Sequence, residues 1–320
     1  MKRYILTMLM SVAVICSCKS DTLDVKTIIK PTEIIDIISD KQFSKGISLL
    51  GLSSSNSAPI DKLYPFDKTN GEPVWKAAQW GSRFNLLGLN PEVKNDSVIY
   101  KNEGKKLSFL KVGDEVLVNM EVYGSKEYRA PRKEGDEWPH LLLEQGTNQV
   151  KLVNLKTLNY SISAKLMFAE NKMGADYNVG MHTAQINLYL LVQNLNKQSA
   201  GYGDFFWFGL PLYDYRYRDM AEYAAQDLGK EDATKKFIFA VAANTLFEGS
   251  LHDKNWVSIN KDIYPQVIAA FNRAKATGYL ATTNLADLGI SSTNVGWEVP
   301  GTFDCGIQFK GLKLTAVANK

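Results

Sequence analysis

Residues 160–168 read YSISAKLMF, and the alternation within this stretch decides the fold class. The apolar positions are Tyr160, Ile162, Ala164, Leu166 and Phe168, and the positions between them hold two serines, a lysine and a methionine. Successive side chains of a β-strand point to opposite faces, so one face of this segment is apolar. The stretch therefore predicts a half-buried strand.

The same alternation recurs on both sides of this strand. It is found in residues 115–122 (EVLVNMEV), 186–192 (INLYLLV) and 303–316 (FDCGIQFKGLKLTA). Several such strands with turn residues between them predict a mainly β fold, an antiparallel β-sandwich or barrel. Two peripheral helices are expected, one over residues 219–228 and one over 265–277, where Pro265 falls in the first turn and Gly278 follows the end.

The N-terminus has the layout of an export signal. Lys2 and Arg3 precede an apolar run at residues 5–16 that is too short to span a bilayer. The run ends in ICSC at 15–18, which resembles the bacterial lipobox and implies cleavage before Cys18 and lipid on that cysteine. We expect a signal peptide at 1–17, a tether and N-terminal packed segment at 18–73, and a β-sandwich domain at 74–320. The expected location is the outer membrane, lipid-anchored, at the cell surface or the periplasmic face.

Composition and motifs narrow the classes of partner and cofactor. With 37 basic and 34 acidic residues and no long basic run, the chain is not expected to bind nucleic acid. The three histidines have no metal-ligand spacing, and no P-loop, nucleotide fingerprint or G-x-S-x-G elbow occurs, so no cofactor or metal is expected. Calcium occurs in folds of this kind, but no D-x-[DN]-x-[DN]-G loop supports it here. Cys305, the only thiol left after processing, is expected to be a small buried residue that forms no disulfide.

A first candidate binding segment is residues 128–140, YRAPRKEGDEWPH, which lead into the apolar strand LLLEQ at 141–145. Arg129, Arg132, Trp138 and His140 would lie at the mouth of this strand. An aromatic face can stack on a sugar ring while arginine forks bind its hydroxyls or a uronate carboxylate. The alternative is a solvated hairpin loop whose tryptophan packs on the sheet edge.

A second candidate is residues 203–219, GDFFWFGLPLYDYRYRD. The continuously aromatic first half is expected in the core. In an extended second half, Tyr213, Tyr215 and Tyr217 would share one face and form a platform beside Asp214 and Arg216. The alternative is a strand end with a surface ladder of aspartate and arginine.

Two resemblances connect these features to carbohydrate. A lipoprotein signal ahead of an aromatic-rich β domain resembles the surface lipoproteins with which Bacteroidetes-type bacteria bind and degrade glycans. The strand pattern over residues 75–317 is similar to the concanavalin A-like jelly rolls of lectins, glucanases and polysaccharide lyases. The glucanase E-x-D-x-x-E strand is absent, and residues 185–187 (QIN) resemble the Q-x-H strand of alginate-lyase-type enzymes with Asn187 in place of the histidine.

Three functions follow as hypotheses. The main one is a membrane-anchored lipoprotein that binds oligo- or polysaccharides for capture or utilisation. The alternative is a glycoside hydrolase or polysaccharide lyase, with Glu144 and Asp214 as carboxylates and His140 or Tyr213 as proton carriers. Glu144 follows three leucines, so burial would raise its pKa as a general acid requires. The third hypothesis is a structural or adhesion protein of the cell surface.

Overall fold

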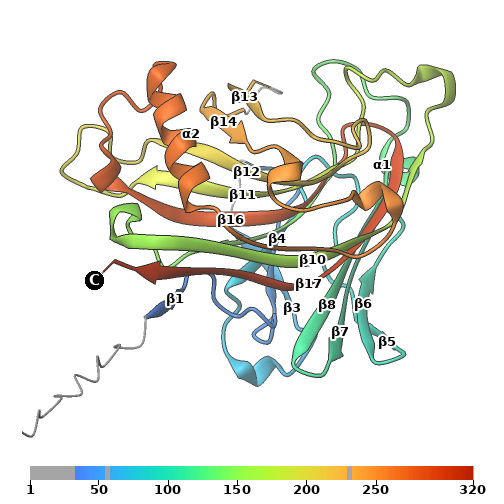
Figure 1. Ribbon diagram of the computed structural model, residues 1–320. Helices are drawn as coiled ribbons and strands as arrows, with labels where there is room; N and C mark the ends of the chain where they lie inside the picture. The colour runs from blue at the N-terminus through green and yellow to red at the C-terminus, as the bar shows by residue number, and fades with distance from the viewer. Residues whose placement is uncertain (1–32, 55–57, 229–232, 320) are drawn as a thin grey trace, which may run out of the picture. The chain divides into compact units, whose positions relative to one another are not determined.

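The computed structural model describes residues 33–319 except 55–57 and 229–232. The predicted signal peptide and Cys18 lie outside the described residues. The described chain is mainly β, and its strands form the two facing sheets of a sandwich, as the alternating segments predict (Figure 1). No helix within the described ranges is long and apolar enough to span a bilayer.

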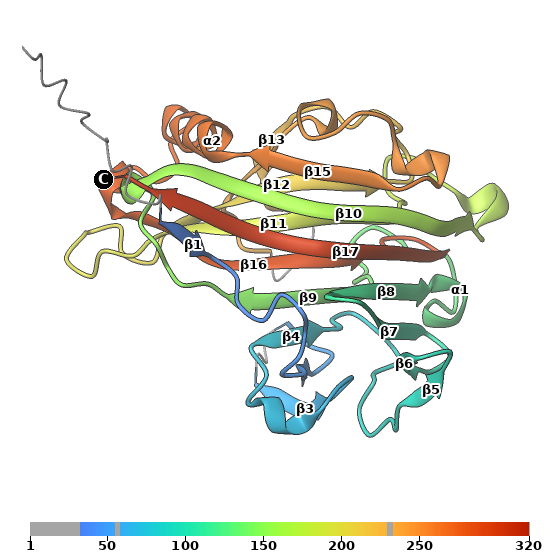
Figure 2. The same cartoon turned by 60° about the horizontal axis from the view of Figure 1, so that its bottom comes forward.

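The first sheet, sheet A, is the one whose long strands β10 and β17 lie toward the viewer in Figure 2. Its order is β15 (Val257–Asp262), β10 (Leu155–Asn171), β17 (Phe303–Ala318), β8 (Glu115–Tyr123), β7 (Lys105–Val112), β6 (Ser97–Lys101) and β5 (Glu92–Lys94), and β1 (Ile34–Asp36) also pairs with β17. All pairs in this sheet are antiparallel. The two longest strands, β10 and β17, are neighbours in this sheet.

Sheet B has nine strands. Their order is β13 (Tyr223–Gln226), β14 (Phe237–Ala240), β12 (Phe205–Asp214), β11 (Gln185–Asn194), β16 (Leu288–Glu298), β9 (His140–Gly146), β4 (Trp75–Ala78), β2 (Ile47–Leu50) and β3 (Pro59–Leu63). The sheet is mixed, because β14 runs parallel to β12 and β4 runs parallel to β2. Residues 33–73, which the sequence analysis set apart from the sandwich, contribute β1, β2 and β3 to the two sheets.

The core lies between the sheets and is built from the inward side chains of the alternating strands. Its largest fully buried members include Trp75, Trp297, Tyr160, Phe206, Phe208 and Phe303. The Trp297 indole N–H of sheet B donates to the Met120 carbonyl of sheet A at 2.9 Å, so the polar end of this side chain is also bonded. Cys305 is fully buried, as predicted, and is the free cysteine of the described chain.

The helices lie at the periphery. The α-helices are α1 (Gly124–Glu127) and α2 (Tyr264–Ala276), and the 3₁₀ turns are η1 (Lys68–Asn70), η2 (Leu152–Asn154), η3 (Gly174–Asp176), η4 (Ala243–Thr245), η5 (Leu251–Asp253) and η6 (Leu285–Asp287). Helix α2 confirms the prediction for 265–277, with Pro265 in its first turn and Gly278 in a left-handed conformation after its end. It buries Val267 and Phe271 against the edge of the sandwich.

Two local predictions were wrong. Residues 219–228 do not form a helix, because β13 pairs with β14 there and exposed Tyr223 belongs to no apolar helical face. Phe168 does not continue the buried series of β10, because a register shift between Leu166 and Phe168 turns its ring to the outer face of sheet A, where it lies against Gly306.

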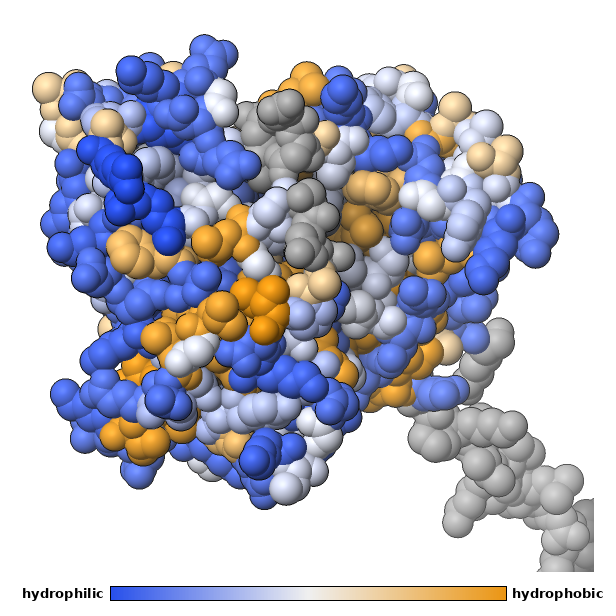
Figure 3. Space-filling view, turned by 180° about the vertical axis from the view of Figure 1, so that it is seen from behind, coloured by the Kyte–Doolittle hydropathy of each residue, from blue (hydrophilic) through white to orange (hydrophobic). Residues whose placement is uncertain are grey.

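The surface is unevenly divided between polar and apolar atoms. Seen from behind, hydrophobic residues lie mostly toward the middle and left of the view, and most of the rim is hydrophilic (Figure 3). Apolar surface is therefore available next to hydrogen-bonding groups on this side of the molecule.

Candidate functional site

The outer face of sheet B carries a row of four side chains from four neighbouring strands. Lys76 of β4 is in register with Glu144 of β9, which is in register with Asn294 of β16, and Asn294 faces Tyr189 of β11. Their strand neighbours Ala77, Leu143, Val295 and Leu188 are buried in the core, so the four side chains of the row point outward. We call this set the Glu144 row.

Further rows of the same face repeat this polar character. Two residues along β11, Asn187 lies opposite Gly296, and two residues beyond that Gln185 lies opposite Glu298. The Gln185 side-chain amide donates to the Glu298 carboxylate at 3.3 Å. Amide and carboxylate groups therefore line the face over several residues of strand length.

Aromatic rings border the Glu144 row on its β12 side. The absence of a side chain at Gly209 leaves room for Tyr189, whose Cε1 would lie 2.8 Å from a Cβ at that position. Trp207 meets the Tyr189 ring edge-on at a centroid distance of 6.0 Å, and Phe205 meets Trp207 in the same way at 5.6 Å. The Trp207 indole N–H donates to the Thr234 hydroxyl at 3.2 Å. The three rings form one aromatic cluster beside the polar row.

The four side chains of the Glu144 row are partly buried. Burial raises the pKa of Glu144, and the nearby ammonium of Lys76 opposes the shift. Burial also raises the pKa of Tyr189 above its ordinary value, assisted by the charge of Glu298. Partial burial of this face is therefore the first cause of both pKa shifts.

The raised pKa of Glu144 gives a testable pH dependence. The folded protein holds the Glu144 proton more strongly than the unfolded chain, so this group costs stability once pH rises above its unfolded pKa. Glu144→Gln is neutral at every pH and is expected to be more stable relative to wild type at pH 7 than at pH 4. Urea unfolding of both proteins at the two pH values measures this difference. A difference of zero or of opposite sign would contradict a buried, ionisable Glu144.

The first predicted binding segment forms a compact cluster of its own. Arg132 is buried, donates through Nε to the Asp136 carbonyl at 3.0 Å and holds its guanidinium 4.9 Å from the Trp138 ring. Trp138 stacks on His140, whose ring Nδ1 lies 2.8 Å from the Trp138 carbonyl. Arg129 is exposed on the same loop and borders a cavity of about 460 Å³. The structure thus brings Arg132, Trp138 and His140 together in packing contacts, while Arg129 is exposed beside a cavity that the same loop lines.

The second predicted segment does not form one tyrosine face. Tyr213 is buried against His252 and Trp297, and β12 ends at Asp214. The chain then turns, so that Tyr215 packs on Phe303. The shared face expected for an extended backbone is therefore absent from this segment.

Asp214 and Arg216 form a partly buried ion pair instead. The Arg216 guanidinium donates to both Asp214 oxygens, at 2.9 Å and 2.7 Å, and the Thr183 hydroxyl adds a bond of 2.7 Å. The hydrogen bonds and the charge of Asp214 raise the pKa of Arg216. The arrangement orders a turn and leaves little of either side chain open to a ligand.

Carboxylate spacing bears directly on the hydrolase hypothesis. Glu144 and Asp214 are three strands and four residues apart, which separates their backbones by about 20 Å, and Glu298 is about 14 Å from Glu144. Side chains of a sheet stand roughly perpendicular to it. Glycoside hydrolysis uses carboxylates roughly 5 to 9.5 Å apart. The predicted pair of Glu144 and Asp214 is therefore not brought together for catalysis.

Sequence reasoning missed most members of this face. Lys76, Asn294 and Tyr189 belong to strands from different parts of the chain, so no local motif contains them. The alternation in residues 186–192 did place Asn187 and Tyr189 opposite the apolar positions. Within the described residues, no group of three or more histidine, cysteine or acidic side chains could hold a metal ion.

Comparison with known proteins gives similarity at the level of strand arrangement only. No protein-family description matches the sequence, and no curated protein matches it. Three similar solved structures are an endoglucanase from Rhodothermus marinus (10% identity, 70% of this chain and 93% of that chain, TM-score 0.38), a family 12 xyloglucanase from Bacillus licheniformis (12%, 72% and 97%, 0.38) and a family 11 xylanase from Neocallimastix patriciarum (9%, 72% and 95%, 0.37). Identity and TM-score at this level carry no conclusion about chemistry.

Proposed function

We propose that this protein binds a glycan chain on the outer face of sheet B and is held to the bacterial outer membrane by lipid on Cys18, for the capture of polysaccharide. The Glu144 row carries the proposal. Its carboxylate, amide and hydroxyl groups match the alternating donors and acceptors of sugar hydroxyls, and an aromatic cluster adjoins them.

The dimensions of the face support a chain rather than a single small ligand. Neighbouring strands lie about 4.8 Å apart, so the four strands of the Glu144 row span about 14 Å. The rows containing Asn187 and Gln185 extend the polar surface along the strands. Several consecutive sugar units can therefore meet hydrogen-bonding groups at once.

Glycoside hydrolysis is a second candidate, supported by one observation. Burial raises the pKa of Glu144, which is the property of a general acid. The nearest outward carboxylate of the neighbouring strand, Glu298, is too distant in the register to serve as its partner. Binding therefore fits the geometry better than cleavage.

One experiment separates the two candidates. The soluble form beginning at Lys19 is run in native gels containing neutral or uronate-bearing polysaccharides, and release of reducing ends is measured with the same panel. We expect retardation by at least one glycan without product release. Tyr189→Ala should weaken that binding about thirtyfold, since it removes both an aromatic contact and a hydroxyl, each contributing about 1 kcal/mol.

Trp256→Ala is the matched control, because Trp256 is an exposed aromatic residue that precedes β15 of sheet A. Equal loss of binding in both variants, or no retardation by any glycan, would refute the binding proposal. Product release that disappears in Glu144→Gln would establish the hydrolase instead.

A further inference from the structure

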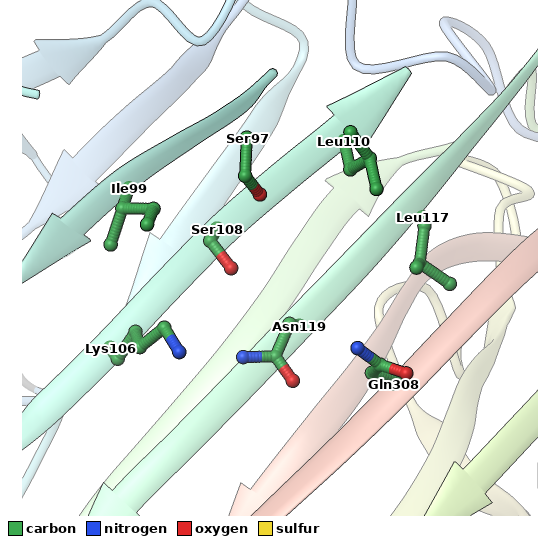
Figure 4. A pocket seen from close by; sticks show the side chains of 8 residues that line it. All are labelled: Ser97, Ile99, Lys106, Ser108, Leu110, Leu117, Asn119 and Gln308. Carbon is green, nitrogen blue, oxygen red and sulfur yellow. The ribbon is translucent and has the colours of Figure 1, made fainter. Parts of the chain in front are cut away.

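A second hollow lies on the outer face of sheet A, on the side of the sandwich opposite the Glu144 row. Its volume is about 140 Å³, and residues of β6, β7, β8 and β17 line it (Figure 4). Enclosed sites for drug-sized ligands measure roughly 300 Å³ or more. The hollow therefore suits one ring or one substituent of a larger molecule.

The floor of this hollow is a row of polar side chains on adjacent strands. Ser108 of β7 is in register with Asn119 of β8, which is in register with Gln308 of β17. Figure 4 shows these three side chains on one side of the sheet. Adjacent strands are about 4.8 Å apart, so the three side chains form a line of about 10 Å across the sheet.

A buried carboxylate holds part of this floor in place. Glu121 accepts hydrogen bonds from the Asn119 amide at 2.7 Å and the Lys106 ammonium at 2.8 Å, and the Tyr123 hydroxyl also donates to it. Burial opposes ionisation of Glu121, but these donors keep its pKa below the ordinary value. The Asn119 side chain is thereby fixed with its nitrogen bonded to the protein and its carbonyl oxygen left to accept.

The remaining polar groups of the floor are uncommitted. In the part of the chain that the structure describes, the Ser108 hydroxyl, the Asn119 carbonyl oxygen and the Gln308 amide have no protein hydrogen-bond partner. Ser108 and Asn119 are nevertheless only 5% and 8% exposed. A ligand that supplies the missing hydrogen-bond partners would therefore gain bonds to groups that the protein itself leaves unpaired.

Apolar side chains complete the hollow. Ile99, Leu110 and Leu117 border the polar row on the same face (Figure 4). A pyranose ring combines hydroxyl groups at its rim with apolar C–H groups on its faces, so it can meet both kinds of wall. The charge of Glu121 is balanced by Lys106, which favours a neutral ligand.

We infer that sheet A carries a second carbohydrate site, which takes one ring of a neutral glycan on Ser108, Asn119 and Gln308. The site is independent of the one proposed on sheet B, since the two faces point away from each other across the core. A single protein could then hold two chains, or two places on one branched polymer, and gain avidity from both.

The test follows side-chain amide resonances by NMR during titration with β-1,4-linked hexasaccharides of glucose and of xylose. Asn119 and Gln308 report the sheet A site, and Asn294 reports the sheet B face. We expect saturable shifts at Asn119 and Gln308 with at least one hexasaccharide. The double variant Ser108→Ala, Gln308→Ala should raise the Kd measured at Asn119 at least tenfold.

Lys313→Ala, an exposed change elsewhere on β17, is the control and should leave that Kd unchanged. Shifts at Asn294 without shifts at Asn119 would overturn the sheet A site while the proposal for sheet B stands. Shifts at Asn119 alone would support the sheet A site and exclude these neutral chains as ligands of the sheet B face. No saturable shift at any reporter would overturn both sites for neutral chains.

Discussion

Lys105→Met is expected to lower the free energy of unfolding by about 3 to 5 kcal/mol, because it leaves a buried carboxylate without its counter-ion. The Lys105 and Glu127 side chains are 0% and 1% exposed, and their charged atoms lie 2.5 Å apart. Lys105 also donates to the Phe84 carbonyl at 3.1 Å, and Glu127 accepts the Arg83 amide at 2.6 Å. One ion pair thus joins β7, α1 and the segment after β4.

Burial lowers the pKa of Lys105, and the charge of Glu127 opposes this shift. The pair therefore depends on both partners, and the double change Lys105→Met, Glu127→Leu should recover a large part of the lost stability. Urea unfolding monitored by tryptophan fluorescence measures each variant. Lys101→Met is the control, because Lys101 pairs with Glu92 in water and should cost at most about 1 kcal/mol. A similar small cost for Lys105→Met would refute the role given to the buried pair.

Cys18→Ser is expected to move nearly all of the protein from the membrane fraction to the soluble fraction of cells that express the full chain. Under the proposal, the lipid on Cys18 is the attachment to the membrane, and more than one acyl chain is needed for stable anchoring. Fractionation followed by immunoblotting measures the distribution, and incorporation of labelled fatty acid measures the modification itself.

Cys16→Ser provides a matched control two residues away. Cleavage next to bulky Ile15 fits the lipobox pattern poorly, so this variant should retain both label and membrane attachment. Loss of membrane attachment in Cys16→Ser but not in Cys18→Ser would show that Cys16 is the lipidated residue. Unchanged attachment and no label in either protein would refute the lipoprotein proposal.

The fold class could be predicted because period two is a local property of the chain. In the strands that hold Val118, Ile162 and Ile307, the alternation of apolar and polar residues identifies the buried face from a short stretch of sequence. Pro265 likewise marks the start of α2. The exceptions depend on distant partners. Residues 223–226 become a strand because β14 offers an edge, and Phe168 changes face because a bulge intervenes in pairing with β17.

The candidate sites were less accessible to sequence reasoning for the same reason. Glu144 was identified because three leucines precede it, which is a local signal of burial. Lys76, Asn294 and Tyr189 join it only through the order of strands in sheet B, and that order is set by packing over more than two hundred residues of chain. Conversely, the aromatic and charged residues of segment 203–219 pack in the core or order a turn, and they do not form an open platform.

The pairing of β1 with β17 has a mechanical consequence. Ile34 lies opposite Val317, so the first and last described strands meet side by side, and β1 is only three residues long (Figure 2). Tension applied between the two ends of the chain would separate these strands in the manner of a zipper, opening one pair of backbone bonds after another. Pairs that open one at a time separate at low force. Strand β1 would therefore detach from β17 before the long pairing of β10 with β17 bears the tension.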